Sequence, residues 1–439
     1  MTATATYNKP AFPCNYPAYW QLLRIKNLFT EIDERSETGS EELLSVSHYT
    51  GVTLKRESLE NEDDFITNAE SLEGYKKVTK GDLVINIMLA WNGSLGISPF
   101  DGITSPAYCV YRVKGNSNPE YFGYLFSTNL MKAEFRKKST GIIDSRLRLY
   151  SDKFFSIFSV VPPVDEQNQI VEYIKAQSQK INHFIAKKQR FIELLKEQRQ
   201  SIIDEAVTRG IDKNVKLKDS GINWLSRIPE HWKVKRLRYC GEFQNGLNKG
   251  GEFFGTGFPF YGYGDIYNNE VLPFEASGLV MSNEEDRNNC SVQEGDVFFT
   301  RTSEIVDEIA MASTCFSTVE DATFSGFLIR FRPYIGILSK YFSAYFFRCS
   351  LLRAYFVKEM NIITRASMSQ NLLKNLPLLI PPIEEQIEIA KFIKTETATI
   401  DKTIAKAEKE IELIKEYKES MIAEAVMGKS KTINTVNAK

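Results

Sequence analysis

One phrase of the sequence occurs twice: VPPVDEQ begins at Val161, and IPPIEEQ begins at Ile380. Each phrase stands in front of a long run whose apolar residues follow helical spacing. An offset of 219 residues, the separation of Pro162 and Pro381, aligns the two runs without a gap as far as Val207. Because internal repetition fixes an architecture before secondary structure is considered, we expect two copies of one unit.

Shorter repeated motifs, called echoes below, precede each of the two runs. Trp20 in YWQLLR corresponds to Trp232 in HWKVKR, and Gly81-Asp82 before LVINIM corresponds to Gly295-Asp296 before VFFTRT. The echoes lie at offsets between 212 and 220 residues, so insertions and deletions fall between framework strands while the long runs stay in register. Further echoes are Tyr121-Phe122 with Tyr341-Phe342 and Gly141-Ile142-Ile143 with Asn361-Ile362-Ile363. Identical pairs inside the runs include Glu166/Glu385, Gln167/Gln386, Ile174/Ile393, Ile181/Ile400, Leu194/Leu413, Ser201/Ser420, Glu205/Glu424 and Ala206/Ala425.

The two runs have the spacing of coiled-coil helices, because their apolar residues alternate steps of three and four. Each proline pair lacks an amide donor and fixes φ, which suits the entry to a helix, and the acidic residues that follow suit the positive N-terminal end. Each helix would be roughly 65 Å long and cannot bury its stripe alone. If a pseudo-twofold axis relates the copies, the helices run antiparallel.

We therefore predict a mixed α/β (α+β) fold with two mixed-sheet domains in a pseudo-twofold arrangement, joined by two long helices that form an antiparallel coiled coil. Each domain contains strand-like runs such as LVINIM and YCVYRV and closes with an amphipathic segment. The predicted boundaries are 1–161 for the first domain with 1–15 flexible, 162–210 for the first helix, 211–223 for a linker, 224–380 for the second domain, 381–427 for the second helix, and 428–439 for a flexible tail.

Composition narrows the class of protein. At 439 residues, 43% hydrophobic and 25% charged, the chain suits two or three globular domains. No apolar run is long enough for a membrane span and no secretion signal precedes the first domain, so we expect a cytoplasmic protein. The six cysteines form no CxxC pair, which argues against a zinc site or a disulfide framework. The net charge of −1 means that any nucleic-acid binding must use local basic surfaces.

Loop and basic residues of the two domains are candidate DNA contacts. Arg and Lys neutralise phosphates, whereas Asn, Gln, Ser, Thr and Arg in loops can read base edges. For any single residue, an ordinary solvated side chain is the alternative. The candidates are His48 and Tyr49 in SHYTG, Asn92 in AWNGS, and Arg136, Lys137, Lys138 and Arg146 in the first copy, with Asn245, Asn248 and Lys249 in QNGLNKGGE, Arg301 and Thr302 in TRTSE, and Arg365 in the second.

The PPxxEQ helix starts, the long helices ending in EAV, the Gly-Asp strands and the WxxxR openings, all in tandem, resemble the specificity subunit of type I restriction-modification systems over nearly the whole chain. The resemblance implies two target recognition domains that each bind one half of a bipartite, asymmetric site in double-stranded DNA. It also implies two methyltransferase subunits docked around the helices, and endonuclease-translocase subunits. AdoMet, ATP and Mg²⁺ would be bound by those partners, with no cofactor and no metal on this chain.

We interpret Glu166, Gln167, Glu385 and Gln386 as assembly contacts on the outer faces of the helices, with simple helix capping as the alternative. Two other functions are alternatives. The first is a coiled-coil scaffold without DNA function. The second is a self-contained methyltransferase, but the sequence argues against it, because neither PP pair has the [NDS]PP[YF] form that holds a target amine, and we predict no catalytic residue.

Overall fold

The computed structural model describes residues 15–48, 50–55, 71–143, 146–222, 225–303, 310–359 and 366–429. At residues 226, 302–303, 357–359 and 366–367 the structure describes the backbone but not the side chains. The predicted flexible segments 1–15 and 428–439 therefore fall almost entirely outside the described residues. The chain divides into two compact units, one formed by Met1–Lys188 with Lys409–Lys439 and the other by Gln189–Glu408.

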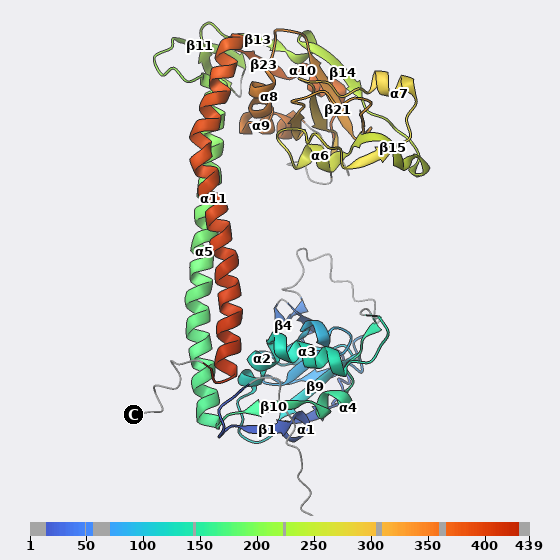
Figure 1. Cartoon of the computed structure of the whole chain (residues 1–439), viewed down its shortest axis with the longest axis vertical. Coiled ribbons are helices and arrows are strands. Elements are labelled where there is room, and N and C mark those ends of the chain that lie inside the picture. Colours follow the sequence, from blue (N-terminus) through green and yellow to red (C-terminus); the bar gives the residue numbers. More distant parts are fainter. Residues whose placement is uncertain are drawn as a thin grey trace, which may run out of the picture. The chain divides into compact units, whose positions relative to one another are not determined.

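The first unit contains one mixed domain (Figure 1). Its central antiparallel sheet has the strand order β2-β9-β6-β7, and β1 pairs separately with β10. Helix α2 packs on the sheet through aromatic side chains such as Phe122 and Phe126, which contact Phe29 of β2. The elements are β1 (Gln21–Arg24), α1 (Ile25–Leu28), β2 (Phe29–Ile32), β3 (Leu44–Ser47), β4 (Gly51–Leu54), β5 (Lys76–Val78), β6 (Leu83–Asn86), η3 (Ala90–Asn92), β7 (Leu95–Ile97), β8 (Gly102–Thr104), β9 (Tyr108–Val113), α2 (Pro119–Ser127), α3 (Asn129–Lys138), α4 (Ser151–Ser156) and β10 (Phe158–Val161).

The second unit repeats this topology. Its central sheet has the order β14-β21-β17-β19, and β13 pairs with β23 as β1 pairs with β10. A three-stranded sheet, β16-β15-β20, is added to this framework. The elements are β11 (Leu217–Ile222), β12 (Leu225–Pro229), β13 (Lys233–Arg236), η5 (Leu237–Tyr239), β14 (Gly241–Asn245), η6 (Gly251–Phe253), β15 (Phe254–Tyr261), α6 (Tyr263–Tyr267), β16 (Gly278–Val280), α7 (Glu284–Asn289), β17 (Val297–Thr300), β18 (Thr302–Ser303), β19 (Ala312–Thr314), β20 (Thr323–Phe324), β21 (Leu328–Pro333), α8 (Lys340–Phe346), α9 (Ser350–Glu359), β22 (Ala366–Ser367), α10 (Gln370–Asn375) and β23 (Pro377–Ile380).

Two long helices follow the domains: α5 (Val164–Arg209) and α11 (Ile383–Val426). Both begin directly after a proline pair, as the sequence predicts. A glycine follows each C-terminal end, and Gly210 has the left-handed φ of +74° that glycine adopts easily at a helix terminus. The fold class predicted from the sequence, mixed sheets with two long helices, is confirmed.

The helices run antiparallel within each unit. In the first unit Lys188 pairs with Glu410 at 2.6 Å, and Lys418 donates to Asn182 at 3.0 Å, so the partner's number falls as the position in α5 rises. In the second unit Arg199 pairs with Asp401 at 2.9 Å. The pairing has the polarity that the repeat predicted.

Each unit has one main core that joins three parts of the sequence. The first core contains Trp20 of the domain and Ile174 near the start of α5, together with Val426 at the end of α11. The second core contains Trp232, Ile393 near the start of α11, and Val207 at the end of α5. The start of each helix is thus buried against the domain that precedes it, and its end is buried against the other domain. This explains why the identical residues of the repeat include the apolar residues at both ends of the helices.

The amphipathic segment that closes the first domain is two helices rather than one. Helix α2 ends at Ser127, and Thr128 has extended backbone and caps α3, its hydroxyl accepting from the Met131 amide at 3.4 Å. In the second domain a break of three residues, 347–349, separates α8 from α9. The break between α2 and α3 directs the basic C-terminal turn of α3 toward the end of strand β6, because α3 packs against η3.

Candidate nucleic-acid interface

An ion pair between a buried aspartate and a partly exposed arginine fixes the central strand of each domain at the Gly-Asp motif. Asp82 accepts from Nε and Nη2 of Arg112 in β9, both at 2.8 Å, and is itself buried. Asp296 accepts from the same two atoms of Arg332 in β21, both at 2.6 Å, and is fully buried. The central strands β6 and β17 start from these anchors. The predicted reading loops AWNGS and TRTSE follow the opposite ends of the two strands, so they occupy corresponding edges of the two sheets.

In the first domain the structure brings two predicted contacts together at this edge. Arg136 of α3 lies over the ring of Trp91, 5.0 Å from its centroid, and Asn92 is the next residue in η3. Lys137 is 72% exposed in its side chain and lies 3.9 Å from Glu134, whereas Lys138 is half-buried. Cations at the end of α3 therefore adjoin a tryptophan and an amide. Such a mixture suits contacts with both phosphates and bases.

Trp91 is a residue that the sequence analysis did not propose. Its position inside AWNGS, the loop already singled out, was the available signal. Its indole Nε1 donates to the Met88 carbonyl at 3.2 Å, which fixes the ring beneath the Arg136 guanidinium.

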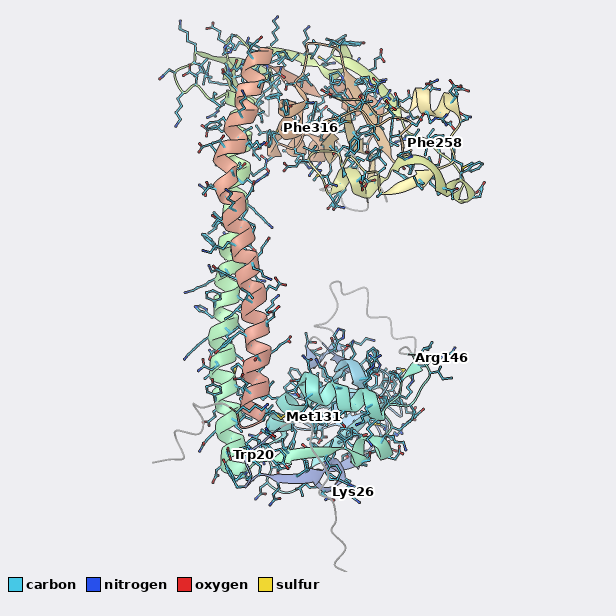
Figure 2. All side chains as sticks on the ribbon, viewed as in Figure 1. Trp20, Lys26, Met131, Arg146, Phe258 and Phe316 are labelled. Atoms are coloured by element: carbon cyan, nitrogen blue, oxygen red, sulfur yellow. The ribbon has the colours of Figure 1, made fainter. Side chains whose placement is uncertain are left out.

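Arg146, labelled in Figure 2, lies in a second loop, which a backbone hydrogen bond ties to the end of β6. Thr140 and Arg148 pair across this loop, and the Leu149 amide donates to the carbonyl of Ile87, which follows β6, at 2.9 Å. His48 lies in the exposed turn between β3 and β4. Tyr49 lies outside the described residues.

In the second domain three strand ends meet. Asn245 is the last residue of β14, Arg301 follows β17, and Phe327 precedes β21, with the Arg301 amide donating to the Phe327 carbonyl at 2.9 Å. Gln370 of α10 donates to Asn245 Oδ1 at 3.0 Å. Arg301 Nε is buried and has no hydrogen-bond partner among the described residues. Phe327, 61% exposed, and Gln370 were missed in the sequence because neither belongs to a repeated or basic motif.

The remaining predicted contacts of this domain differ in exposure and in their hydrogen-bond partners. Asn248 is exposed. Lys249 is bound inside the domain, 2.5 Å from Asp286 and 3.0 Å from the Met281 carbonyl, and the hydrogen bond from Lys249 lowers the pKa of Asp286. Its charge is therefore already partly compensated by its own domain. The side chain of Thr302 and all of Arg365 lie outside the described residues. That any of these residues contacts DNA stays a prediction.

The start of each long helix forms a buried junction with its own domain. Glu166 accepts from Trp20 Nε1 and from the Tyr19 hydroxyl, both at 3.1 Å. Gln167 Oε1 accepts from the Asn118 amide at 2.8 Å, at the N-cap of α2, and its Nε2 donates to the Pro162 carbonyl at 2.9 Å.

The second junction repeats the first. Glu385 accepts from Trp232 Nε1 at 3.0 Å and contacts His231 Nε2 at 2.7 Å. Gln386 Oε1 accepts from the Ser339 amide at 2.7 Å, at the N-cap of α8, and its Nε2 donates to the Pro381 carbonyl at 2.9 Å.

The placement of these four residues on outer helix faces was wrong. Glu166, Gln167 and Gln386 are buried, and the side chain of Glu385 is only 22% exposed. The physical reason is that buried Trp and amide donors need acceptors, and the first turn of the helix supplies them. That these residues also touch a partner subunit stays a prediction. Among the residues that the structure describes, no helix is both long and apolar enough to cross a membrane.

The sequence comparisons agree with the duplicated domains and junctions. Residues 229–413 match the sequence model of the family described as "Type I restriction modification DNA specificity domain". The resemblance to type I specificity subunits that the repeated motifs indicated is confirmed by this match and by curated relatives.

Two relatives and one solved structure illustrate the similarity. The chain is 22% identical to the type I restriction enzyme EcoKI specificity subunit of Escherichia coli K12, over 80% of this chain and 75% of that one. It is 23% identical to the type I restriction enzyme MjaVIII specificity subunit of Methanocaldococcus jannaschii, over 95% and 94%. A solved chain described as "Structural basis underlying complex assembly and conformational transition of the type I R-M system" shares the fold, with a TM-score of 0.69, 14% identity, and coverage of 95% of this chain and 100% of that one.

Proposed function

We propose that the chain is the DNA-recognition subunit of a type I restriction-modification complex and that it reads a bipartite, asymmetric target. One observation carries the proposal: corresponding edges of two equivalent sheets present different side chains. The first edge presents Trp91, Asn92 and Arg136, and the second presents Asn245 and Arg301. Two domains with one scaffold and different reading loops suit two unlike half-sites, with the long helices setting the spacing between them.

The chemistry at each edge suits double-stranded DNA. Arg and Asn are the side chains that make bidentate contacts with guanine and adenine in the major groove, and exposed lysines neutralise phosphates. In this proposal the chain itself is not catalytic and acts in the cytoplasm. Methyl transfer and cleavage belong to its partners, to which AdoMet, ATP and Mg²⁺ are assigned.

The experiment is to co-express the chain with its methyltransferase subunit in a host without DNA methylation and to sequence the genomic DNA for modified adenines. A bipartite motif with two dissimilar halves and a fixed gap supports the proposal. Replacing Asn92 or Arg136 should change or weaken recognition of one half only, and replacing Asn245 or Arg301 should affect the other. Co-purification of the two proteins without any methylation would instead favour a scaffold.

We further propose that two copies of the methyltransferase subunit bind an exposed stripe that occurs once on each long helix. The first stripe consists of Leu194, Glu197, Ser201 and Glu205 of α5, and the second of Leu413, Glu416, Ser420 and Glu424 of α11. Residues at these spacings lie on one face of a helix. All eight side chains are exposed, with Leu194 at 47% and Leu413 at 51%.

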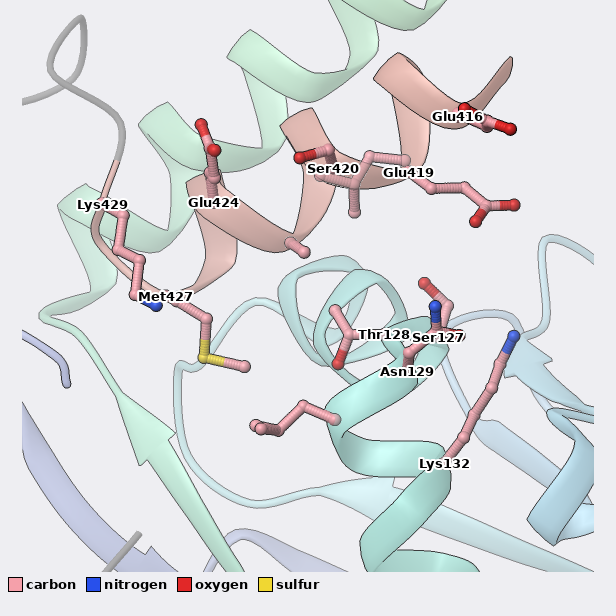
Figure 3. Close-up of a pocket in the computed structure, with 13 residues that line it drawn as sticks. Ser127, Thr128, Asn129, Lys132, Glu416, Glu419, Ser420, Glu424, Met427 and Lys429 are labelled. Carbon is pink, nitrogen blue, oxygen red and sulfur yellow. The ribbon is translucent and has the colours of Figure 1, made fainter. Parts of the chain in front are cut away.

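Packing inside the chain accounts for the buried identical residues of the repeat, such as Ala206 and Ala425, but not for identical exposed ones. A groove beside each stripe adds to this argument. In the first unit it has a volume of about 590 Å³ and is lined by Glu416, Ser420 and Glu424 opposite the start of α3 (Figure 3). In the second unit the corresponding groove has a volume of about 770 Å³ and is lined by the equivalent residues of α5 opposite the start of α9. The same acidic and apolar chemistry in two places suits one partner present in two copies.

A stoichiometry measurement tests the stripes. Leu194→Arg and Leu413→Arg should each remove one of two bound methyltransferase subunits, as measured by size-exclusion chromatography with light scattering, and the double variant should remove both. Phe184→Arg is the matched control, because Phe184 is 41% exposed on α5 and Thr403 stands at its repeat position. Two bound subunits in the double variant would exclude the stripes as the contact.

A further inference from the structure

A hairpin of the first domain, closed by Thr140 and Arg148 and described at residues 140–143 and 146–148, presents apolar side chains to solvent. Ile142 is 99% exposed and Ile143 is 53% exposed. The hairpin nevertheless has its own apolar anchors, because Leu147 and Leu149 are buried. Ile142 and Ile143 are adjacent, so together they give the hairpin a small exposed apolar surface.

The hairpin holds this apolar side chain away from the domain. Thr140 and Arg148 exchange two backbone hydrogen bonds of 2.9 Å each, which close its base. Gly141 has a φ of +151°, and a Cβ at this position would lie 2.5 Å from the Arg146 carbonyl oxygen. Only glycine fits at position 141. Ile142 is the next residue, and its side chain extends into solvent.

The surroundings of the hairpin are basic. Lys137 and Lys138 end the helix that leads into it, and Arg146 lies within it. The side chains of Lys137 and Arg146 are exposed, and that of Lys138 is half-buried. Apolar side chains beside cations suit a partner that presents anionic groups around an apolar surface. Duplex DNA is such a partner, because anionic phosphates flank its apolar base stack.

The hairpin also belongs to the reading edge. The hydrogen bond from the Leu149 amide to the Ile87 carbonyl ties its second strand to the residue after β6, the strand that leads to Trp91 and Asn92. The labelled Arg146 marks the hairpin in Figure 2. The sequence has an Ile-Ile pair at the corresponding point of the second copy, Ile362-Ile363, which lies outside the described residues.

We propose that Ile142, supported by Ile143, inserts as a wedge between adjacent base pairs of the bound duplex, while the neighbouring cations contact the phosphates. The proposal rests on the DNA-recognition function proposed above. Isoleucine is one of the side chains that unstack a base step in this way and kink the duplex. The cost of unstacking depends on the step, and pyrimidine–purine steps are the easiest to open. The wedge would therefore add a preference for a flexible step that no polar side chain contacts.

The test uses the full chain assembled with its methyltransferase partner and a duplex containing the target found by methylation sequencing. 2-Aminopurine is placed at successive positions in and beside the half-site read by the first domain. Because its fluorescence rises when it is unstacked, binding of the wild-type complex should raise the signal several-fold at one step only. Ile142→Ala should abolish the rise and weaken binding about tenfold, equivalent to ~1.4 kcal/mol. Ile142→Leu should retain both.

Ile335→Ala is the matched control, because Ile335 is also fully exposed, at 104%, but belongs to the second domain. It should leave the fluorescence and the affinity unchanged. Tight binding of the wild type without a rise at any position would overturn the wedge and leave the proposed function standing. Loss of methyltransferase binding in Ile142→Ala would overturn it in favour of a protein contact. Failure of the wild-type complex to bind any methylated target would overturn the proposed function, and the wedge with it.

Discussion

Glu166→Ala should loosen the first unit specifically. The carboxylate is buried and accepts from Trp20 Nε1 and the Tyr19 hydroxyl, both at 3.1 Å. Trp20 is itself only 4% exposed, so its indole N–H would be left without a partner in the variant. A hydrogen bond to a charged group contributes about 1.5–3 kcal/mol, and an orphaned buried donor costs about 1–3 kcal/mol.

Since these two terms overlap, we expect a loss of ~3 kcal/mol in the free energy of unfolding of the first unit. For a unit of this size that corresponds to about 6–12 °C in its Tm. Glu166→Gln keeps one acceptor oxygen for Trp20 and should cost only ~1 kcal/mol. The two units need separate readouts, because unfolding of such a chain need not be two-state.

Hydrogen exchange measured peptide by peptide gives a separate readout for each unit. Exchange should increase in β1 and β10 of the Glu166→Ala variant and stay unchanged in β13 and β23. Glu172→Ala is the matched control, because Glu172 is an exposed glutamate on the same helix. An equal effect of Glu172→Ala, or equal loosening of both units by Glu166→Ala, would refute the reasoning.

Other expectations follow from single features. Removing about one turn in register from both long helices should change the number of unspecified bases between half-sites, read by methylation sequencing; an unchanged gap would exclude the helices as a ruler. Charge reversal at Arg136, Lys137 and Lys138 should weaken DNA binding broadly and reduce its salt dependence in a titration, whereas an altered motif with the same salt slope would make them base readers. Asp296→Ala leaves the Arg332 charge uncompensated and should cost about 3–5 kcal/mol by denaturant unfolding; a loss below 1 kcal/mol would mean that the ion pair is dispensable. Burial raises the pKa of Cys349 to about 12, so iodoacetamide at pH 8 should leave this thiol unmodified until urea is added. Because the thiol of an unfolded chain ionises near pH 8.5, the free energy of unfolding should be independent of this group below about pH 8.5 and should decrease above it.

The framework of the fold was predictable because the repeat gives two different sequences for the same helices and strands. The long helices follow from alternating three- and four-residue spacing, and their starts follow from the proline pairs. Strands β6 and β9 were recognisable as the apolar runs LVINIM and YCVYRV. Asp82 and Asp296 were noticed only as part of a motif, and their ion pairs with Arg112 and Arg332 become visible once the neighbouring strands are placed.

The direction of side chains near a helix start could not be read from the sequence. A glutamate such as Glu166 after a proline pair suits the helix dipole whether it faces solvent or a tryptophan. The decisive fact is the buried Trp20 indole about 150 residues away, which the chain alone does not place. The same limit applies to Trp91, since its contact with Arg136 joins a loop to a helix some 45 residues later.

The repeated junctions and the unlike loops answer different physical demands. A buried Trp donor and a buried helix N-cap each require an acceptor of fixed geometry, so Glu and Gln stand at the same two positions in both copies. Asn92 and Asn248 at the strand ends have exposed side chains, so residues at such positions can differ between the copies without loss of fold. Asn92 beside Trp91 in one copy and Asn245 beside Gln370 in the other are consequences of this freedom. A chain built in this way can vary the side chains at the two sheet edges while the helices and their junctions stay the same.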